Sequence, residues 1–241
     1  MLTKITEYLT YRNNILVNYV EPHLMNEQEA EKSFNQLIEK HYSKEECFLS
    51  PQPMNKQKGD KKKKAFFTCA INLLTEHAIK QFNLKNSCHI TCDYDPRHLT
   101  FLTKSNNHNK TYITNTYSRR FDGAIPTLKN PVAIWEIKEY YYTSTFGSRI
   151  ADGIYETQLD GYEIKHTTNE KPLHYFMIDG HSAWWEQGKS YLCRIIDILN
   201  MGLVNEVIFG NEIYDIWENR IKQICQYYID RKVKQSNDKN N

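Results

Sequence analysis

The chain has 241 residues, of which 40% are hydrophobic and 13% aromatic, and its formal net charge at pH 7 is +2. A chain of this length can bury one substantial core, and so small a net charge excludes a polycation that binds nucleic acid over its whole surface. No stretch approaches the roughly eighteen apolar residues of a membrane span, and the N-terminus lacks the charged-then-apolar order of a signal peptide. We therefore expect a cytoplasmic protein without membrane contact, whose six cysteines are reduced thiols.

Two amphipathic helices are predicted at the N-terminus. Apolar residues recur at helical spacing in the first helix, and Pro22 marks its end. Asn26 and Glu29 match a capping box that begins a second helix with an apolar stripe of its own. Neither helix carries obvious chemistry, so we expect residues 1–64 to form a helical layer followed by a basic loop.

The loop over residues 47–64 carries a dense group of lysines, six of them among the nine residues 56–64. Its prolines and its glycine favour an exposed connection over a helix or a strand. The lysines can be a solvated surface or a patch that contacts phosphate groups. In the second interpretation the nucleic-acid-binding residues include four consecutive lysines, Lys61, Lys62, Lys63 and Lys64.

A third helix is predicted over residues 65–80, with Glu76 at the margin of its apolar arc. Two strands, over residues 87–94 and 98–103, are then expected to form a hairpin that turns at Asp95 and Pro96. Cysteines and histidines in this region suggest a zinc site, but a structural zinc site needs two well-spaced ligand pairs and only one is present. Ordinary strand positions are therefore the better interpretation of Cys88, His89, Cys92 and His98.

A second predicted hairpin places two acids and a lysine on neighbouring strands. Its strands cover residues 117–124 and 132–138, and the loop between them contains two prolines. Because side chains alternate along a strand, Glu136 and Lys138 point to the same face, while Ile137 points to the other. Charged groups at the end of an apolar strand must be paired, hydrated or bound to a metal. Asp122, at the end of the preceding strand, is the natural partner.

A helix over residues 148–165 follows the second hairpin. At about 100° per residue, one half of this helix has Gln158 in its middle and also holds Ile150, Ala151, Ile154, Tyr155, Gly161 and Tyr162. The acids Asp152, Glu156, Asp160 and Glu163 fall on the opposite half. A buried amide without partners costs on the order of 1–3 kcal/mol, so we expect Gln158 to have a specific role inside the protein.

The remaining elements alternate between strand and helix, with strands over 173–178 and 205–209 and helices over 190–201 and 213–232. This order favours an α/β sheet, and we place the main domain at residues 65–233. Residues 234–241 form a polar tail for which we expect disorder. Trp184 and Trp185 can form an apolar clamp or a partner contact, and the sequence does not choose between them.

The acid at Asp122, followed by Glu136, Ile137 and Lys138, resembles the catalytic signature of the PD-(D/E)XK nuclease superfamily, to which type II restriction endonucleases belong. Phe121 stands where the family loosely keeps a proline. The segment from Gln158 to Tyr162 is similar to the QxxxY motif of the RecB-like branch. The resemblance implies a restriction-endonuclease-like α/β core: a central mixed β-sheet flanked by helices, with the N-terminal helical layer added.

The resemblance also implies a mechanism and roles for individual residues. Mg²⁺ would be held by Asp122, Glu136 and the backbone carbonyl of Ile137. Lys138 would lie against the attacking water, and Gln158 would orient that water or the lysine. Three further positions are implied by the same plan: Glu76 as an added catalytic carboxylate near the metal, and Ser148 and Arg149 as phosphate contacts at a helix N-terminus.

The sequence therefore predicts a Mg²⁺-dependent endonuclease acting on double-stranded DNA, most similar to a sequence-specific type II restriction enzyme. Cutting at palindromes would favour a symmetric homodimer. An end-directed RecB-like repair nuclease is the first alternative, and a non-catalytic nucleic-acid-binding module on the same fold is the second. A two-carboxylate glycosidase would leave Lys138 and Gln158 without a role. The chain contains no GxxxxGK[ST] motif, which excludes an ATP-driven function of the P-loop type.

Overall fold

The computed structural model describes residues 2–41, 48–55, 63–106, 110–142, 147–167 and 171–237, with the side chains of 149 and 235–237 left aside. Its centre is a five-stranded sheet in the order β1-β4-β5-β6-β7. The pairs β1–β4 and β4–β5 are antiparallel, whereas β5–β6 and β6–β7 are parallel. The strands are β1 (Asp93–Tyr94), β4 (Gly123–Ile125), β5 (Ala133–Glu139), β6 (Leu173–Asp179) and β7 (Glu206–Phe209).

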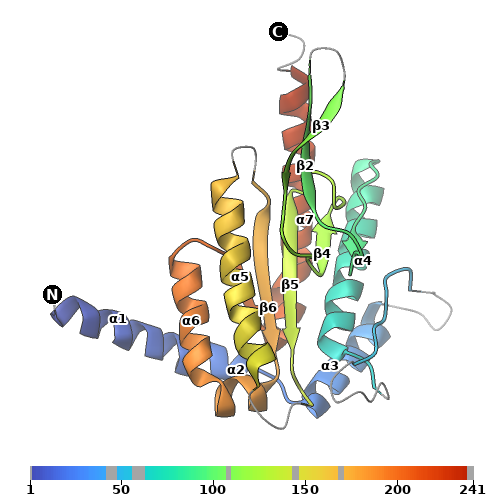
Figure 1. Cartoon of the computed structure of the whole chain (residues 1–241). Coiled ribbons are helices and arrows are strands. Elements are labelled where there is room, and N and C mark those ends of the chain that lie inside the picture. Colours follow the sequence, from blue (N-terminus) through green and yellow to red (C-terminus); the bar gives the residue numbers. More distant parts are fainter. Residues whose placement is uncertain are drawn as a thin grey trace.

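Helices cover both faces of this sheet (Figure 1). One face packs against α3 (Glu27–His41), α4 (Phe66–Asn86) and α7 (Ile213–Asn237), and the other against α5 (Ser148–His166) and α6 (Lys189–Asn200). Shorter helical turns lie at η3 (Ser182–Gln187) and η4 (Gly210–Glu212). The predicted fold class, a central mixed sheet flanked by helices with an added N-terminal helical segment, is confirmed.

Alternation along β5 and β6 divides the side chains between the two cores, as expected from the pleat of a strand. In β6, Tyr175 and Met177 enter the core with α4 and α7, while Phe176 and Ile178 enter the core with α5 and α6. In β5, Trp135 belongs to the α4 and α7 side. Glu136 and Lys138 point to the opposite face of β5 from Trp135, and therefore toward α5.

The N-terminal segment is part of these same cores. It consists of α1 (Leu2–Ile15), a π-helical stretch η1 (Leu16–Val20) and α2 (Glu21–His23). This helical run ends at His23, one residue past the predicted end at Pro22. The predicted capping box is confirmed, with Asn26 and Glu29 each accepting a hydrogen bond from the other's backbone N–H. Leu16, Val20 and Leu24 lie in the core with α5 and α6, and Ala30 and Phe34 lie in the core with α4 and α7.

A two-stranded hairpin, β2 (Phe101–Ser105) and β3 (Thr111–Thr116), lies outside the main sheet. The predicted hairpin between 87–94 and 98–103 was wrong, since β1 pairs with β4 and β2 pairs with β3. Asp95 explains the difference: it adopts a positive φ of 40°, and its backbone N–H donates to the Asp122 carbonyl at 2.8 Å. The chain therefore turns toward β4 at this point instead of back along β1.

The other predicted elements agree with the structure within a few residues, except at three places. Helix α4 continues to Asn86, six residues past its predicted end at residue 80. The strand expected over 117–124 is confined to β4, and its earlier residues form a loop that carries Arg119. The final helix α7 continues to Asn237, past the predicted start of the tail at Lys234. Within the described part of the chain, the helices are all too short or too polar to cross a bilayer. The five cysteines described are free thiols.

Candidate functional site

The hairpin of β4 and β5 brings the two acids together. Gly123 pairs with Trp135 in the antiparallel register, and continuing that register by one residue places Asp122 opposite Glu136. Residues directly opposite in such a pair lie about 4.5–5.5 Å apart. β4 begins at Gly123, so the backbone N–H of Ile137 has no partner in that strand and donates to the Asp122 carboxylate at 2.6 Å instead.

Glu136 is buried with 3% of its surface exposed, and Lys138 is its nearest cation. The Lys138 ammonium donates to Glu136 Oε1 at 2.5 Å. Oε2 of the same carboxylate is buried and has no hydrogen-bond partner in the parts of the chain that the structure describes. Burying a carboxylate oxygen without a partner is unfavourable. Glu136 thus has one oxygen, Oε1, paired with Lys138, and a second, Oε2, that is available to bind a cation or to accept a hydrogen bond.

Gly153 allows helix α5 to approach this point closely. A Cβ at residue 153 would lie 2.9 Å from Cε of Lys138 and 3.3 Å from its Cδ. A larger residue would push the lysine stem away from Glu136. The glycine therefore sets the position of the Lys138 side chain between the sheet and the helix.

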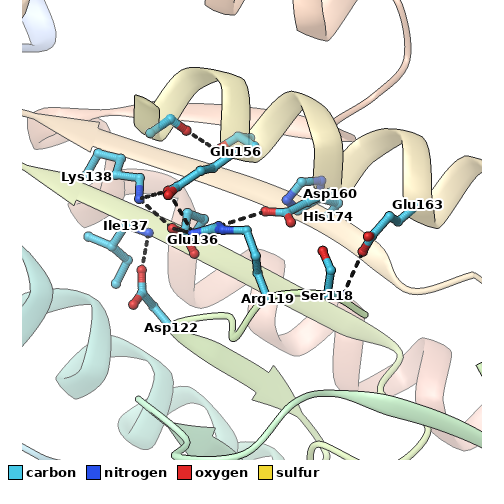
Figure 2. A network of polar contacts seen from close by, with 12 residues as sticks. Ser118, Arg119, Asp122, Glu136, Ile137, Lys138, Glu156, Asp160, Glu163 and His174 are labelled. Carbon is cyan, nitrogen blue, oxygen red and sulfur yellow. Dashed lines mark hydrogen bonds and ion pairs between the residues drawn. The ribbon is translucent and has the colours of Figure 1, made fainter. Parts of the chain in front are cut away.

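Arg119 joins the cluster from the loop before β4 (Figure 2). Its guanidinium is 3.1 Å from Glu136 Oε1, 2.9 Å from Glu156 and 3.2 Å from Asp160. Lys138 also lies 3.5 Å from Glu156. Two cations thus lie among four acids, Asp122 included, so the cluster carries an excess of negative charge when all four acids are ionised. Such an excess favours the binding of a further cation.

Two carboxyl groups of the cluster have strongly raised pKa values. Burial, and then the neighbouring Glu136 carboxylate, raise the pKa of Asp122 to about 7, although Lys138 opposes the shift. Burial raises the pKa of Asp160 to about 7 against the effect of Arg119. For Lys138, burial lowers the pKa, but the charge and hydrogen bond of Glu136 and the charge of Asp122 raise it, and the net shift is upward. Clusters of perturbed carboxyl groups of this kind are typical of functional sites.

His174 lies beneath the cluster and is fully enclosed. Its Nδ1 contacts the Leu203 carbonyl at 3.0 Å, and Nε2 is buried without a hydrogen-bond partner among the residues described. Burial lowers the pKa of His174 to about 4, so this imidazole is neutral at pH 7. It contributes no charge to balance the acids.

Gln158 does not join the cluster, and its predicted orientation was wrong. Its side chain is only partly buried, and the structure gives it no hydrogen bond to any described residue. Tyr162, the other residue of the QxxxY pattern, is 37% exposed, whereas Asp160 is fully buried. The buried face of α5 is therefore rotated away from the amide that the sequence placed at its centre.

Glu76 is engaged elsewhere. Its two carboxylate oxygens accept the backbone N–H groups of Leu49 at 3.1 Å and Ser50 at 2.7 Å. It lies on α4, which packs on the opposite face of the sheet from the side chains of Glu136 and Lys138. Glu76 holds the 48–55 segment in place, and its contacts do not support the predicted catalytic role.

The predicted phosphate contacts are placed only in part. Lys63 forms an ion pair with Glu27, and Lys64 lies 5.2 Å from the Phe34 ring centre, so both pack against α3. Ser148 is exposed at the first residue of α5. Lys61, Lys62 and the Arg149 side chain lie outside the described residues.

Three residues of the cluster were missed by the sequence: Arg119, Glu156 and Asp160. The sequence analysis assigned Glu156 and Asp160 to the polar half of their helix. Asp160 lies three residues after Thr157 and seven after Gly153, which are both buried, and this helical spacing could have identified it as buried too. Arg119 stands three residues before Asp122, where a basic side chain beside an acidic pair is a reasonable partner. Cys88, His89, Cys92 and His98, for which the zinc interpretation was not adopted, do not form a group that could hold a metal ion in the described part of the chain.

The fold and this cluster define an α/β protein with a buried group of acids and two cations where β4 and β5 meet α5. The chain belongs to the family described as domain of unknown function DUF7687, whose model matches residues 25–224. That match includes the whole sheet and every residue of the cluster. Comparison with curated proteins and with solved structures gives no match.

Proposed function

We propose that the chain is a Mg²⁺-dependent endonuclease that hydrolyses phosphodiester bonds in double-stranded DNA, in the manner of a type II restriction enzyme. The observation that carries this proposal is the meeting of Asp122, Glu136 and Lys138 on adjacent strands, in the order that the PD-(D/E)XK signature requires. The fold supports it as well, because the central sheet is mixed and flanked by helices, as the resemblance implied.

The residues present fit a hard cation. Glu136 offers a buried oxygen without a partner, and Asp122 offers a carboxylate destabilised by its surroundings. Asp122 and Glu136 would hold Mg²⁺, with the Ile137 carbonyl as a further ligand, because hard cations prefer oxygen ligands. Bound Mg²⁺ would neutralise the charge that develops on the phosphate.

Lys138 has the properties of an electrostatic stabiliser. Its raised pKa keeps the ammonium protonated at neutral pH. It can therefore donate hydrogen bonds to an attacking water or to a phosphate oxygen, but it cannot accept the proton of that water. Arg119 would hold Glu136, Glu156 and Asp160 in position around it.

The position of Gln158 helps to decide between an endonuclease and a nuclease of the RecB-like branch. Its amide is partly exposed and stays outside the cluster, so the RecB-like motif loses its chemical basis in this chain. This favours an endonuclease over an end-directed repair nuclease. We accordingly propose cleavage within duplex DNA, and recognition of palindromes would make the active form a symmetric homodimer.

A non-catalytic nucleic-acid-binding module is the second candidate, and one observation favours it. Arg119 already pairs with three carboxylates, which lowers the gain from binding a metal ion there. The two candidates differ in one respect that can be measured: a module would retain DNA without cutting it.

The test is incubation of supercoiled plasmid with the full chain in Mg²⁺ or in EDTA. We expect Mg²⁺-dependent conversion of circular DNA to nicked and linear forms, with discrete bands from a large linear phage DNA. Asp122→Asn and Lys138→Met should each reduce the rate by about 100-fold or more. Lys165→Met and Asp152→Asn, at exposed positions on α5, are the matched controls and should cut as the wild type does.

Each other outcome has a distinct meaning. DNA retained in a gel shift without any cleavage would favour the non-catalytic module. Degradation of linear but not circular DNA would favour the end-directed nuclease. Cleavage that is equal in wild type, Asp122→Asn and Lys138→Met would come from another enzyme in the preparation and would refute the proposed site.

A further inference from the structure

Three helices on the opposite face of the sheet bring two histidines and a glutamate together. His41 is the last residue of α3, His77 lies in α4 and Glu218 lies in α7. His77 Nδ1 is 2.9 Å from Glu218 Oε1, and His41 Nε2 is 3.6 Å from the same oxygen. Among the residues that the structure describes, this is the one group of three such side chains close enough to share a metal ion.

The distances fit tetrahedral coordination. With metal–ligand bonds of about 2.0–2.1 Å, two ligand atoms of a tetrahedral Zn²⁺ site lie roughly 3.3 Å apart. The observed distances of 2.9 and 3.6 Å lie on either side of this value, and all three ligand atoms lie within 4.8 Å of one another. Shifts of a few tenths of an ångström would therefore bring both histidine–glutamate distances to the tetrahedral value.

A hydrogen-bonded cluster without metal explains the three residues less well. One carboxylate oxygen faces both imidazoles, yet only His77 is at hydrogen-bonding distance, because 3.6 Å is too long for His41. The two rings lie 4.3 Å apart at 52° and so are not stacked.

Residues around the cluster provide outer contacts of the kind that metal ligands require. The Gln81 amide lies 3.1 Å from Nε2 of His77, and rotation of the amide by 180° would present its oxygen to an N–H there. This would leave Nδ1 of His77 free to bind the metal. Lys222, 3.7 Å from the second oxygen of Glu218, orients that carboxylate.

We propose that His41, His77 and Glu218 form a Zn²⁺ site that links α3 to α4 and α7. Imidazole nitrogens select Zn²⁺ over Mg²⁺, which prefers oxygen ligands and keeps its waters. With three protein ligands the fourth position is left for water. The site is separate from the Asp122 cluster and does not depend on the proposed nuclease activity.

Binding of Zn²⁺ to the full chain, after removal of bound metals with a chelator, tests the site directly. We expect calorimetry to give one Zn²⁺ bound per protein chain, and excess Mg²⁺ should not compete for this site. At a free Zn²⁺ concentration 100 times the dissociation constant, the thermal midpoint should rise by roughly 5–10 °C. Co²⁺ in the same site should give the visible absorption of a tetrahedral complex.

Substitutions locate the metal. His77→Gln and Glu218→Gln should each weaken binding at least tenfold and remove the Co²⁺ absorption, whereas His98→Gln, at an exposed position, should leave both unchanged. Asp122→Asn should also keep the Co²⁺ absorption, which separates this site from the candidate active site. Urea unfolding of each variant without metal shows whether it is folded. His41→Gln, at a helix end, is the alternative where the others fail to fold.

Two results would overturn the proposal. One is wild-type protein that binds neither Zn²⁺ nor Co²⁺. The other is a folded His77→Gln or His41→Gln variant that binds Zn²⁺ as tightly as the wild type does.

Discussion

Replacing Asp160 with asparagine tests the charge balance of the acidic cluster. Asp160 is 0% exposed, and Oδ2 accepts from Arg119 at 3.2 Å. Its Oδ1 is buried and has no hydrogen-bond partner in the described chain. Burial is the largest cause that raises its pKa from 3.8 to about 7. Asparagine has nearly the same shape and keeps an oxygen for Arg119, but it cannot ionise.

The sign of the effect follows from proton linkage. Below pH 3.8 the carboxyl group is protonated in both the folded and the unfolded chain. As the pH rises to 7 the unfolded chain loses this proton while the folded chain keeps it, so the free energy of unfolding falls. A shift of about three pH units at about 1.4 kcal/mol per unit corresponds to about 4 kcal/mol, lost by the wild type between pH 4 and 7. Asp160→Asn lacks this loss.

Urea unfolding at several pH values between 4 and 8 measures the effect. The stability of Asp160→Asn relative to the wild type should increase by up to about 4 kcal/mol over this range. Asp152→Asn, on the exposed side of the same helix, measures the effect of removing one acid in solvent. A difference between Asp160→Asn and wild type that stays constant with pH would refute the reasoning. It would mean that Arg119 outweighs burial and that Asp160 is ionised in the folded chain.

Three further substitutions test the packing around the sheet. Gly161→Ala should destabilise the protein by about 1–3 kcal/mol in thermal unfolding, because its Cβ would lie 2.4 Å from the Leu203 carbonyl oxygen. The control Gly147→Ala, whose Cβ meets nothing within 4 Å, should show no such loss. Thr75→Val should lower the free energy of unfolding in urea by about 1–3 kcal/mol, since the buried Trp217 Nε1–H donates to Thr75 Oγ1 at 2.8 Å. Thr75→Ser keeps the acceptor, so an equal loss of stability in both variants would argue against a contribution from this bond. Asp179→Ala should lower the free energy of unfolding by roughly 3–5 kcal/mol and speed hydrogen exchange at the Met25 amide. The reason is that Asp179 accepts hydrogen bonds from the Met25 and Gly180 N–H groups and from the Tyr141 hydroxyl. Unchanged exchange at Met25 would contradict this.

The sequence predicted the part of the site that depends on local periodicity. Alternation along β5 fixes which residues share a face, and the hairpin register places Asp122 opposite Glu136. Both follow from residues close together in the chain. The alternation of strands and helices after residue 148 likewise predicted an α/β sheet.

The orientation of α5 could not be obtained in this way. Counting Tyr155 and Tyr162 as apolar turned the predicted buried face toward Gln158. In the structure Tyr155 is 49% exposed, and the Arg194 guanidinium lies 5.2 Å from its ring centre, so this aromatic surface is covered from the side by a cation. Asp160 can be buried because Arg119 reaches it from 41 residues away in the sequence, and no helical pattern contains that information.

The main sheet tapers toward both of its edges. β5 and β6 have seven residues each, whereas β1 has two and β7 has four. The outermost strands of a sheet carry unpaired N–H and C=O groups that can recruit a strand from another molecule, and short edges limit this recruitment. The long, apolar strands are thus kept in the interior, and the chain presents little template for edge-to-edge aggregation from its central sheet.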